Sequence, residues 1–235
     1  CLDACEEESN EVDKAFTLGN IAITYGNLRE YDNSIKYFRE SLALIKKLNY
    51  TQAETNGLNN LADAYKKAGA FDKALTYLKE AIKISEELGD KSQKAYSLNL
   101  MGEIYTLLGE FKLAKKYFEE SLELAKSTSD ITSQISSYIL LGKLFKNNGI
   151  YDSALDSFKN ARYLAEQKKA VKELIEVHKG LSESYSLMNR HEKALENYKV
   201  HHTYEKELFD SNVDKRLKTL FMQNQIKTRD KEYQL

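Results

Sequence analysis

Apolar residues recur along the chain at helical spacing, and whole blocks of them return every 40 residues. In the second block, Leu58, Leu61, Ala62 and Tyr65 fall at i, i+3, i+4 and i+7, which places them on one face of a helix. Gly69 interrupts the pattern where a helix end needs a left-handed residue. A second apolar stripe follows: Phe71, Ala74, Leu75, Leu78, Ala81 and Ile82. Each block therefore predicts two helices joined by a tight turn.

The repetition extends over five blocks without an insertion. We call the set of residues at one position of every repeat a column. One column is aromatic: Tyr25, Tyr65, Tyr105, Phe145 and Tyr185. Another, three residues earlier, is small: Ala22, Ala62, Gly102, Gly142 and Ser182. Because a single hairpin cannot bury both of its faces, each is expected to stack on the next.

Helix starts and the ends of the repeat region are also predicted. Thr51 with Glu54 and Asp90 with Gln93 resemble capping boxes, and Asp130 is a further N-cap candidate. The expected organisation is an N-terminal tail over residues 1–14, five repeats over residues 15–205 (about 15–50, 51–90, 91–130, 131–170 and 171–205) and a C-terminal helix or linker over residues 206–235.

The C-terminal segment carries only a narrow apolar stripe among charged residues: Val213, Leu217, Leu220 and Phe221. A long helix with such a seam should pack on the last hairpin or on a partner chain, which would permit a homodimer.

Composition narrows the classes of function. There is no proline, as expected for helix almost throughout, and 35 basic against 36 acidic residues give a net charge of −1. This balance excludes a globally basic nucleic-acid binder. No phosphate-binding loop, zinc-protease or nucleophile motif occurs, so neither catalysis nor a cofactor or metal is expected. His178 and His191 are expected to pack in apolar columns, and His201 with Glu205 to lie on a solvated face.

These columns resemble those of the tetratricopeptide repeat family. The family signature of large apolar, small, aromatic, Gly, aromatic, Ala, aromatic and Ala is matched in the second repeat by Leu61, Ala62, Tyr65, Gly69, Phe71, Ala74, Leu78 and Ala81. The resemblance implies an all-α, right-handed superhelix (an α-solenoid) of five hairpins plus a long C-terminal helix. The 40-residue, proline-free unit is longer than the usual 34 residues and is similar to repeats of bacterial sensor kinases and signalling regulators.

In such a fold the first helix of each repeat lines the concave groove, so residues beside the packed columns would meet a ligand. The expected binding residues are Asn20, Asn59, Asn60, Asp63, Lys66, Asn99, Glu103, Lys143 and Lys146. Lys67, Thr106 and Ile139 share this side. The resemblance implies that Asn20 and Asn60 bind a ligand backbone, although they could instead tie adjacent helices together or simply face water. Asp63 and Glu103 disfavour a clamp for a C-terminal carboxylate, which they would repel.

The expected function is a non-catalytic protein-binding or peptide-binding module, in the sensory or scaffolding region of a bacterial signalling protein. Alternatives are a peptide-pheromone-type receptor that acts as a regulator, and a structural oligomerisation scaffold. The sequence starts at Cys1, which fits either a processed lipoprotein or an arbitrary boundary, so extracytoplasmic and cytoplasmic locations both stay open. Membrane attachment outside this segment is compatible with the first reading. Cys1 and Cys5 alone imply neither a disulfide framework nor a zinc site.

Overall fold

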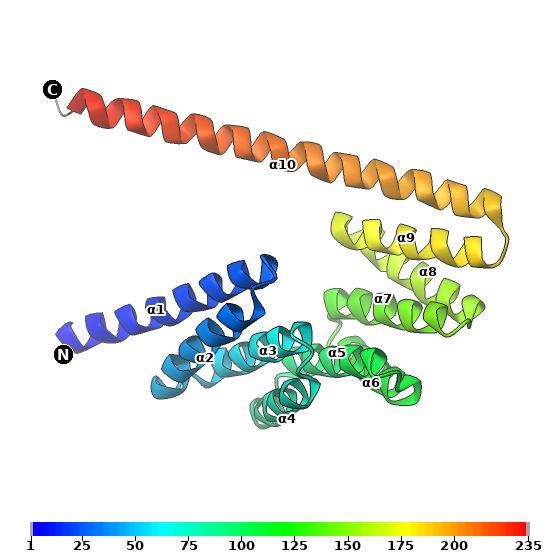
Figure 1. The fold of residues 1–235 in the computed structure, drawn as a ribbon, viewed down its shortest axis with the longest axis horizontal. Helices are drawn as coiled ribbons and strands as arrows, with labels where there is room; N and C mark the ends of the chain where they lie inside the picture. The colour runs from blue at the N-terminus through cyan, green and yellow to red at the C-terminus, as the bar shows by residue number, and fades with distance from the viewer. Residues whose placement is uncertain (1, 234–235) are drawn as a thin grey trace. The chain divides into compact units, whose positions relative to one another are not determined.

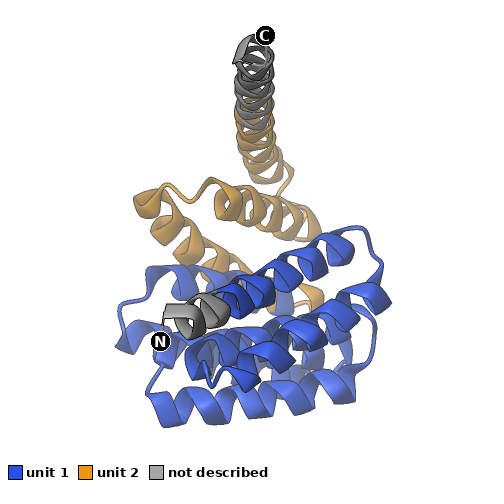
Figure 2. Ribbon diagram, turned by 90° about the vertical axis from the view of Figure 1, so that its left-hand side faces the viewer, with its two compact units in different colours: residues 1–144 blue, residues 145–235 orange. Residues whose placement is uncertain are grey.

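The computed structural model describes the backbone of residues 2–233 and the side chains of residues 10–211 and of Val213. Over this range it contains ten helices and no strand. The chain divides into two compact units, residues 1–144 and residues 145–235, which Figure 2 colours separately. The side chains of Cys1, Cys5, Leu217, Leu220 and Phe221 lie outside the described residues, so the expectations that rest on them remain predictions.

Unit 1 contains six complete helices and most of a seventh (Figure 1): α1 (Leu2–Asn27), α2 (Tyr31–Lys47), α3 (Thr51–Lys67), α4 (Phe71–Leu88), α5 (Lys91–Leu107), α6 (Phe111–Ser127) and α7 (Ile131–Asn147). From α1 to α6 each helix packs on the next, and α3 also contacts α5. The first helices of the second and third repeats are therefore neighbours. Helix α1 begins at Leu2, so it includes the segment expected as an N-terminal tail.

The turns follow a rule simpler than the 40-residue repeat, because a left-handed residue occurs every 20 residues. Gly69 has φ +76°, as predicted, and the full series is Arg29, Asn49, Gly69, Gly89, Gly109, Ser129, Gly149, Lys169 and Asn189. In every case the next helix begins two residues later. The residue between is therefore the N-cap position.

This spacing explains which predicted caps form. Asp90 and Asp130 occupy N-cap positions, and their carboxylates accept hydrogen bonds from the backbone N–H groups of Gln93 (3.0 Å) and Ser133 (3.1 Å). The prediction for Thr51 was wrong, because Thr51 is already the first helical residue. Tyr50 precedes α3 and provides no side-chain cap.

The core of unit 1 is built from the predicted columns. Leu58, Leu61, Leu78 and Ile104 are completely buried. At Gly102 the two helices of a hairpin come so close that an added Cβ would overlap the ring of the buried Phe118. A second aromatic column, not recognised in the sequence, stacks on the first, with ring centroids 5.3–5.5 Å apart in the pairs Tyr25–Tyr37, Tyr65–Tyr77 and Tyr105–Tyr117.

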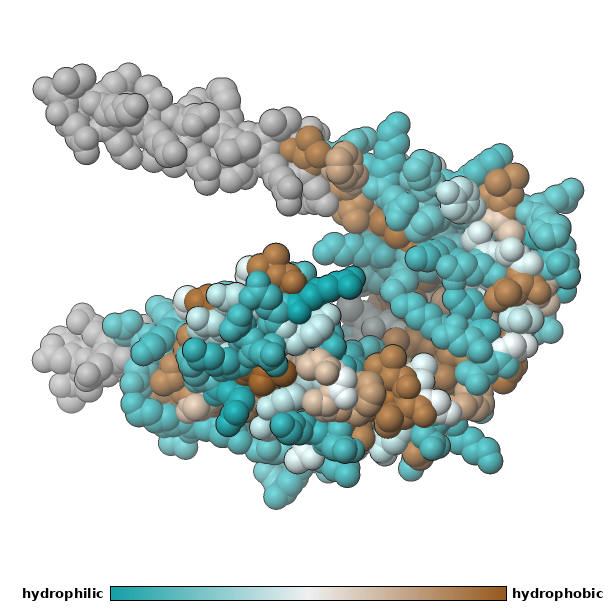
Figure 3. Space-filling view, viewed as in Figure 1, coloured by the Kyte–Doolittle hydropathy of each residue, from teal (hydrophilic) through white to brown (hydrophobic). Residues whose placement is uncertain are grey.

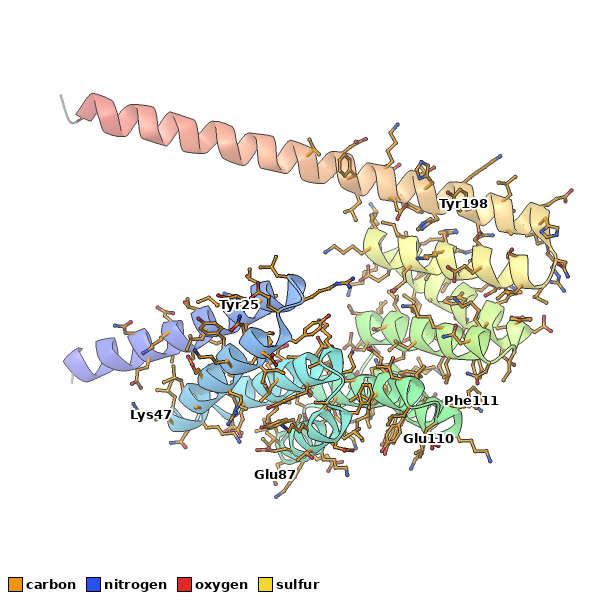
Figure 4. All side chains as sticks on the ribbon, in the orientation of Figure 1. Tyr25, Lys47, Glu87, Glu110, Phe111 and Tyr198 are labelled. Carbon is orange, nitrogen blue, oxygen red and sulfur yellow. The ribbon has the colours of Figure 1, made fainter. Side chains whose placement is uncertain are left out.

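Unit 2 contains the end of α7 and the helices α8 (Tyr151–Lys168), α9 (Val171–Leu187) and α10 (His191–Tyr233). Phe158 of α8 is completely buried and lies against Gly180 of α9. Tyr198 of α10, in the same column and labelled in Figure 4, is 56% exposed. At this position, α10 is not covered by other described residues. The polar hydroxyl group of Tyr198 suits such an exposed position.

The close approach at Gly102 yields a stability prediction. Gly102→Ala should lower the free energy of unfolding by about 1–3 kcal/mol through overpacking, although alanine is the better helix former by about 1 kcal/mol. Adding Phe118→Leu should recover much of the loss, since it recreates the Ala62 and Leu78 combination of the second repeat. A double-mutant cycle in urea would measure this coupling. Additive effects of the two changes would contradict the explanation.

Candidate peptide-binding face

The candidate site is the side of α1, α3 and α5 that carries most of the predicted binding residues. We call it the inner face of unit 1 and define it by the following residues: Phe16, Asn20, Ile23, Asn60, Asp63, Lys66, Lys67, Tyr96 and Glu103. They occupy a few columns of the first helix, so neighbouring helices present them at similar heights. An ion pair between Lys66 of α3 and Glu103 of α5 joins two of the helices directly.

Lys66 is the centre of a fixed cluster of charges. Its side chain is only 11% exposed, and its Nζ atom lies 2.8 Å from an Asp63 carboxylate oxygen and also pairs with Glu103. The other Asp63 oxygen is 2.7 Å from the Nζ atom of Lys67. Burial acts to lower the pKa of Lys66, but the carboxylates of Glu103 and Asp63 outweigh it and raise the pKa above its ordinary value. Two acids and two bases are therefore held in fixed positions with no net charge.

Tyr96 borders this cluster and was missed by sequence reasoning. Tyr96 is 47% exposed, so its side chain is only partly buried. This partial burial and the nearby Asp63 carboxylate raise the pKa of its hydroxyl group. Its column reads Phe16, Asn56, Tyr96, Ser136 and Glu176, so no shared residue type marked it. The only available signal was its distance of seven residues from Glu103, which is two helical turns.

Asn59 and Asn99 do not face a ligand, which corrects the expectation for both. Each is buried, and each bonds to the first helix of the next repeat. The Ser97 hydroxyl donates to Asn59 Oδ1 at 2.7 Å, and Asn59 Nδ2 donates to Gln93 Oε1 at 3.2 Å. Asn99 Nδ2 lies 3.1 Å from the Ser137 hydroxyl oxygen. These amides fasten neighbouring repeats together.

Asn20 and Asn60 differ from them. Asn20 is exposed and Asn60 is half-buried, and neither side-chain amide hydrogen-bonds another described residue. On α1, Asn20 lies between the exposed Phe16 and Ile23, at i−4 and i+3. Free amides beside apolar side chains are thus available on this face.

The remaining predicted residues are less available. Lys143 of α7 is half-buried and takes part in further interactions, and Ile139, expected on the same side, is buried. Thr106 donates its hydroxyl to the Gly102 carbonyl oxygen. In unit 2, Lys146 pairs with Glu183 of α9. That pair repeats the 37-residue offset of Lys66 and Glu103.

The histidines have structural environments. His178 is buried as expected, and its Nδ1 atom donates to Asn197 Oδ1 at 3.0 Å, because Asn197 Nδ2 is itself a donor to the Lys193 carbonyl oxygen. His201 is also buried, against the Ile175 carbonyl oxygen at 2.9 Å, so its assignment to a solvated face was wrong. His191 is exposed, so the packing expected for it was wrong too. Within the described residues no three His, Cys, Asp or Glu side chains come together as metal ligands.

Comparison with known proteins identifies the repeat. Residues 13–87 and 52–127 match the model of the tetratricopeptide repeat family. The chain belongs to the tetratricopeptide repeat family. A search of curated protein sequences finds no match.

Solved structures share the fold of this tetratricopeptide repeat protein. BtubC (BKLC) from P. vanneervenii has a TM-score of 0.68 at 20% identity, over 86% of this chain and 90% of that one. A putative kinesin light chain from Podosopora anserina with nearly identical TPR-like repeats has a TM-score of 0.61 at 14% identity, over 84% and 97%. A Rap protein solved with competence and sporulation factor has a TM-score of 0.61 at 17% identity, over 85% and 66%.

These likenesses confirm the all-α solenoid fold expected from the sequence. Tetratricopeptide repeats are generally protein-interaction scaffolds without catalytic activity, and residues 13–127 of this chain match them. None of the helices described here is both long and apolar enough to cross a bilayer.

The buried cation predicts how the inner face responds to substitution. Lys66→Met keeps the aliphatic stem but leaves Asp63 and Glu103 without their shared cation, which should lower the free energy of unfolding by about 1–3 kcal/mol. Lys67→Met removes one exposed pair and should cost less than about 1 kcal/mol. Urea unfolding of both variants measures the difference. Equal losses would show that Lys66 is no more than a surface charge.

The buried imidazole predicts a pH dependence. Burial lowers the pKa of His178 below its ordinary 6.5, with Arg162 and His201 acting the same way and Asn197 and Glu166 opposing. As the pH falls below about 6.5, the unfolded chain therefore binds a proton that the folded chain does not, and stability decreases by up to about 1.4 kcal/mol per pH unit. His178→Gln keeps a donor for Asn197 but cannot titrate. The stability difference between wild type and variant should thus change between pH 7.5 and 5.5, and a constant difference would contradict this account.

Proposed function

We propose that this tetratricopeptide repeat protein binds an extended peptide or protein segment on the inner face of unit 1. The observation that carries the proposal is the combination of free amides with exposed apolar side chains around a prepositioned charge cluster. Asn20 and Asn60 each offer a donor and an acceptor, as a peptide bond requires. Phe16, Ile23 and Tyr96 offer apolar contact area beside them.

The charge cluster favours binding by being ordered in advance. Because Lys66 is already held by two carboxylates, a ligand does not bear the entropic cost of ordering this long side chain. The cluster has no net charge, so recognition would depend on local donors and acceptors more than on the overall charge of the ligand. A terminal carboxylate is a poor fit, since Asp63 and Glu103 lie on the face it would occupy.

A regulatory role in signal transduction is the finer part of the proposal. It is supported by similarity of fold to the Rap protein solved with competence and sporulation factor and to aspartyl phosphate phosphatase F from Bacillus subtilis (TM-score 0.65, 13% identity, over 83% of this chain and 60% of that one). The chain spans about two thirds or less of those two proteins. A receptor that responds to a bound segment by changing the packing of its repeats is therefore the form of regulation we favour.

Adjacent asparagines provide a matched test. Twelve-residue peptides are first selected from a random display library on the wild-type protein. Calorimetry then measures their affinity for the wild-type protein and for two variants. Asn60→Ala should weaken binding about two- to tenfold, the value of one hydrogen bond, without changing thermal unfolding. Asn59→Ala should instead lower stability by about 1–3 kcal/mol, because it removes a buried amide that accepts a hydrogen bond from Ser97 and donates one to Gln93 of the next repeat.

Two results would contradict the proposal. One is that selection on the wild-type protein enriches no peptide more strongly than selection on a variant with Phe16→Glu and Ile23→Glu. The other is that enriched peptides bind wild type and Asn20→Ala, Asn60→Ala protein equally.

A further inference from the structure

The third hairpin departs from the other four along α6. Because the repeats provide the same local environment five times, the other hairpins serve as internal controls. Figure 4 labels Glu110 and Phe111, which mark the start of α6 at this tip. The departures concern exposed residues, so core packing does not explain them.

The tip of the third hairpin carries three exposed leucines. Leu107, Leu108 and Leu113 are 61%, 46% and 37% exposed. The first two positions are also apolar in the fifth repeat, as Leu187 and Met188, and the second is Leu28 in the first repeat. Leu113 alone has only polar equivalents, which are Asn33, Lys73, Ser153 and Lys193. Figure 3 shows hydrophobic surface over the region of α5 and α6. Exposed apolar residues gathered at one point commonly mark an interaction site.

Charge along α6 is reversed relative to the other second helices. Lys112 stands where they have Asp32, Asp72, Asp152 and Glu192. Glu119 stands where they have Arg39, Lys79, Lys159 and Lys199. A lysine in the first turn opposes the helix dipole, which the acidic residues complement. The reversal therefore works against the stability of α6.

A shallow depression of about 690 Å³ follows the same side of α6 and is lined by Phe111, Lys112, Lys115, Lys116, Glu119 and Glu120, together with Glu123. The equivalent side of α2 has a depression of about 440 Å³ with the usual charge order. The shape thus recurs in the repeat, whereas Leu113 and the reversed charge order are confined to the third hairpin.

We propose that the α6 face, meaning Leu107, Leu108, Leu113 and the depression beside them, binds an amphipathic segment of a partner protein. Apolar side chains of that segment would cover the leucines. Its acidic residues would lie against Lys112, Lys115 and Lys116, and its basic residues against Glu119, Glu120 and Glu123. Leu107 shares a column with Lys67 of the inner face, but the rest of this surface lies on α6 and in the turn before it, so it gives the module a second partner.

The charges favour this occupant over two others. An anionic membrane would be attracted by the lysines but repelled by three glutamates on the same face. A second copy paired antiparallel through α6 would match lysines with glutamates, yet it would place the leucines beside polar residues near Glu123 and Lys126. A partner segment with apolar residues at one end, acidic residues in one half and basic residues in the other satisfies both features.

The probe is a fluorescent 18-residue synthetic helix with leucines at i, i+3, i+4 and i+7, acidic residues in one half and basic residues in the other. Its control is an isomer of identical composition with the charges interspersed. In anisotropy titrations the wild-type protein should bind the bipolar helix about tenfold more tightly than the isomer. Equal binding of the two peptides would overturn the proposal.

Variants built from residues that other repeats carry keep the fold and locate the site. Leu107→Lys with Leu113→Lys should weaken binding about tenfold with unchanged thermal unfolding. Lys112→Asp with Glu119→Lys should weaken binding about tenfold without lowering the unfolding temperature, because it restores the charge order that complements the helix dipole. Lys79→Glu on α4 and Asn60→Ala on the inner face should have no effect. Unchanged binding by the α6 variants would overturn the proposal. So would tighter binding to phosphatidylserine vesicles than to the bipolar helix, or a dimer in light scattering that the α6 substitutions dissociate.

Discussion

Each hairpin of this protein can bury its apolar faces only against its neighbours, and this constraint governs the rest of the structure. It fixes which residues meet: a side chain on one first helix reaches a residue 37 or 38 positions later, on the next first helix. Any polar group at that contact is removed from water and must find its partner there. The 40-residue period therefore determines which polar residues hydrogen-bond between repeats, as well as which apolar residues pack together.

The polar pairs obey this register. Asn59 meets Ser97, and Asn99 meets Ser137, at the same two positions of successive repeats. In the first repeat these two positions read Gly19 and Gly57. The residues at the two positions are thus both small and apolar in one repeat and both polar in the next. An unmatched amide would cost free energy, whereas a matched amide and hydroxyl distinguish the correct stacking from a shifted one.

Local features of the fold were predictable from the sequence, and non-local features of the site were not. Helices, the left-handed residue at Gly69 and the Asp90 and Asp130 caps depend on residues within one turn. Asn59 and Asn60 are adjacent in sequence and point in directions about 100° apart on a helix. Which of the two contacts the next repeat is decided by a serine 38 residues away, and no local pattern carries that information. Tyr96 was missed because its column has no shared residue type.

Repeats also permit an inference that a single domain would not. A residue that differs from its equivalents because its contact differs, as Asn59 differs from Gly19, is explained by packing. Lys112, Leu113 and Glu119 differ from their equivalents without filling a new space, and Lys112 opposes the dipole of its own helix. Glu119 gains an exposed ion pair with Lys115, but such a pair on a helix contributes only about 0.3–0.5 kcal/mol, so we attribute these choices to a cause outside the folded chain. Binding of a partner is the physical interaction that an exposed leucine and a reversed charge order can serve.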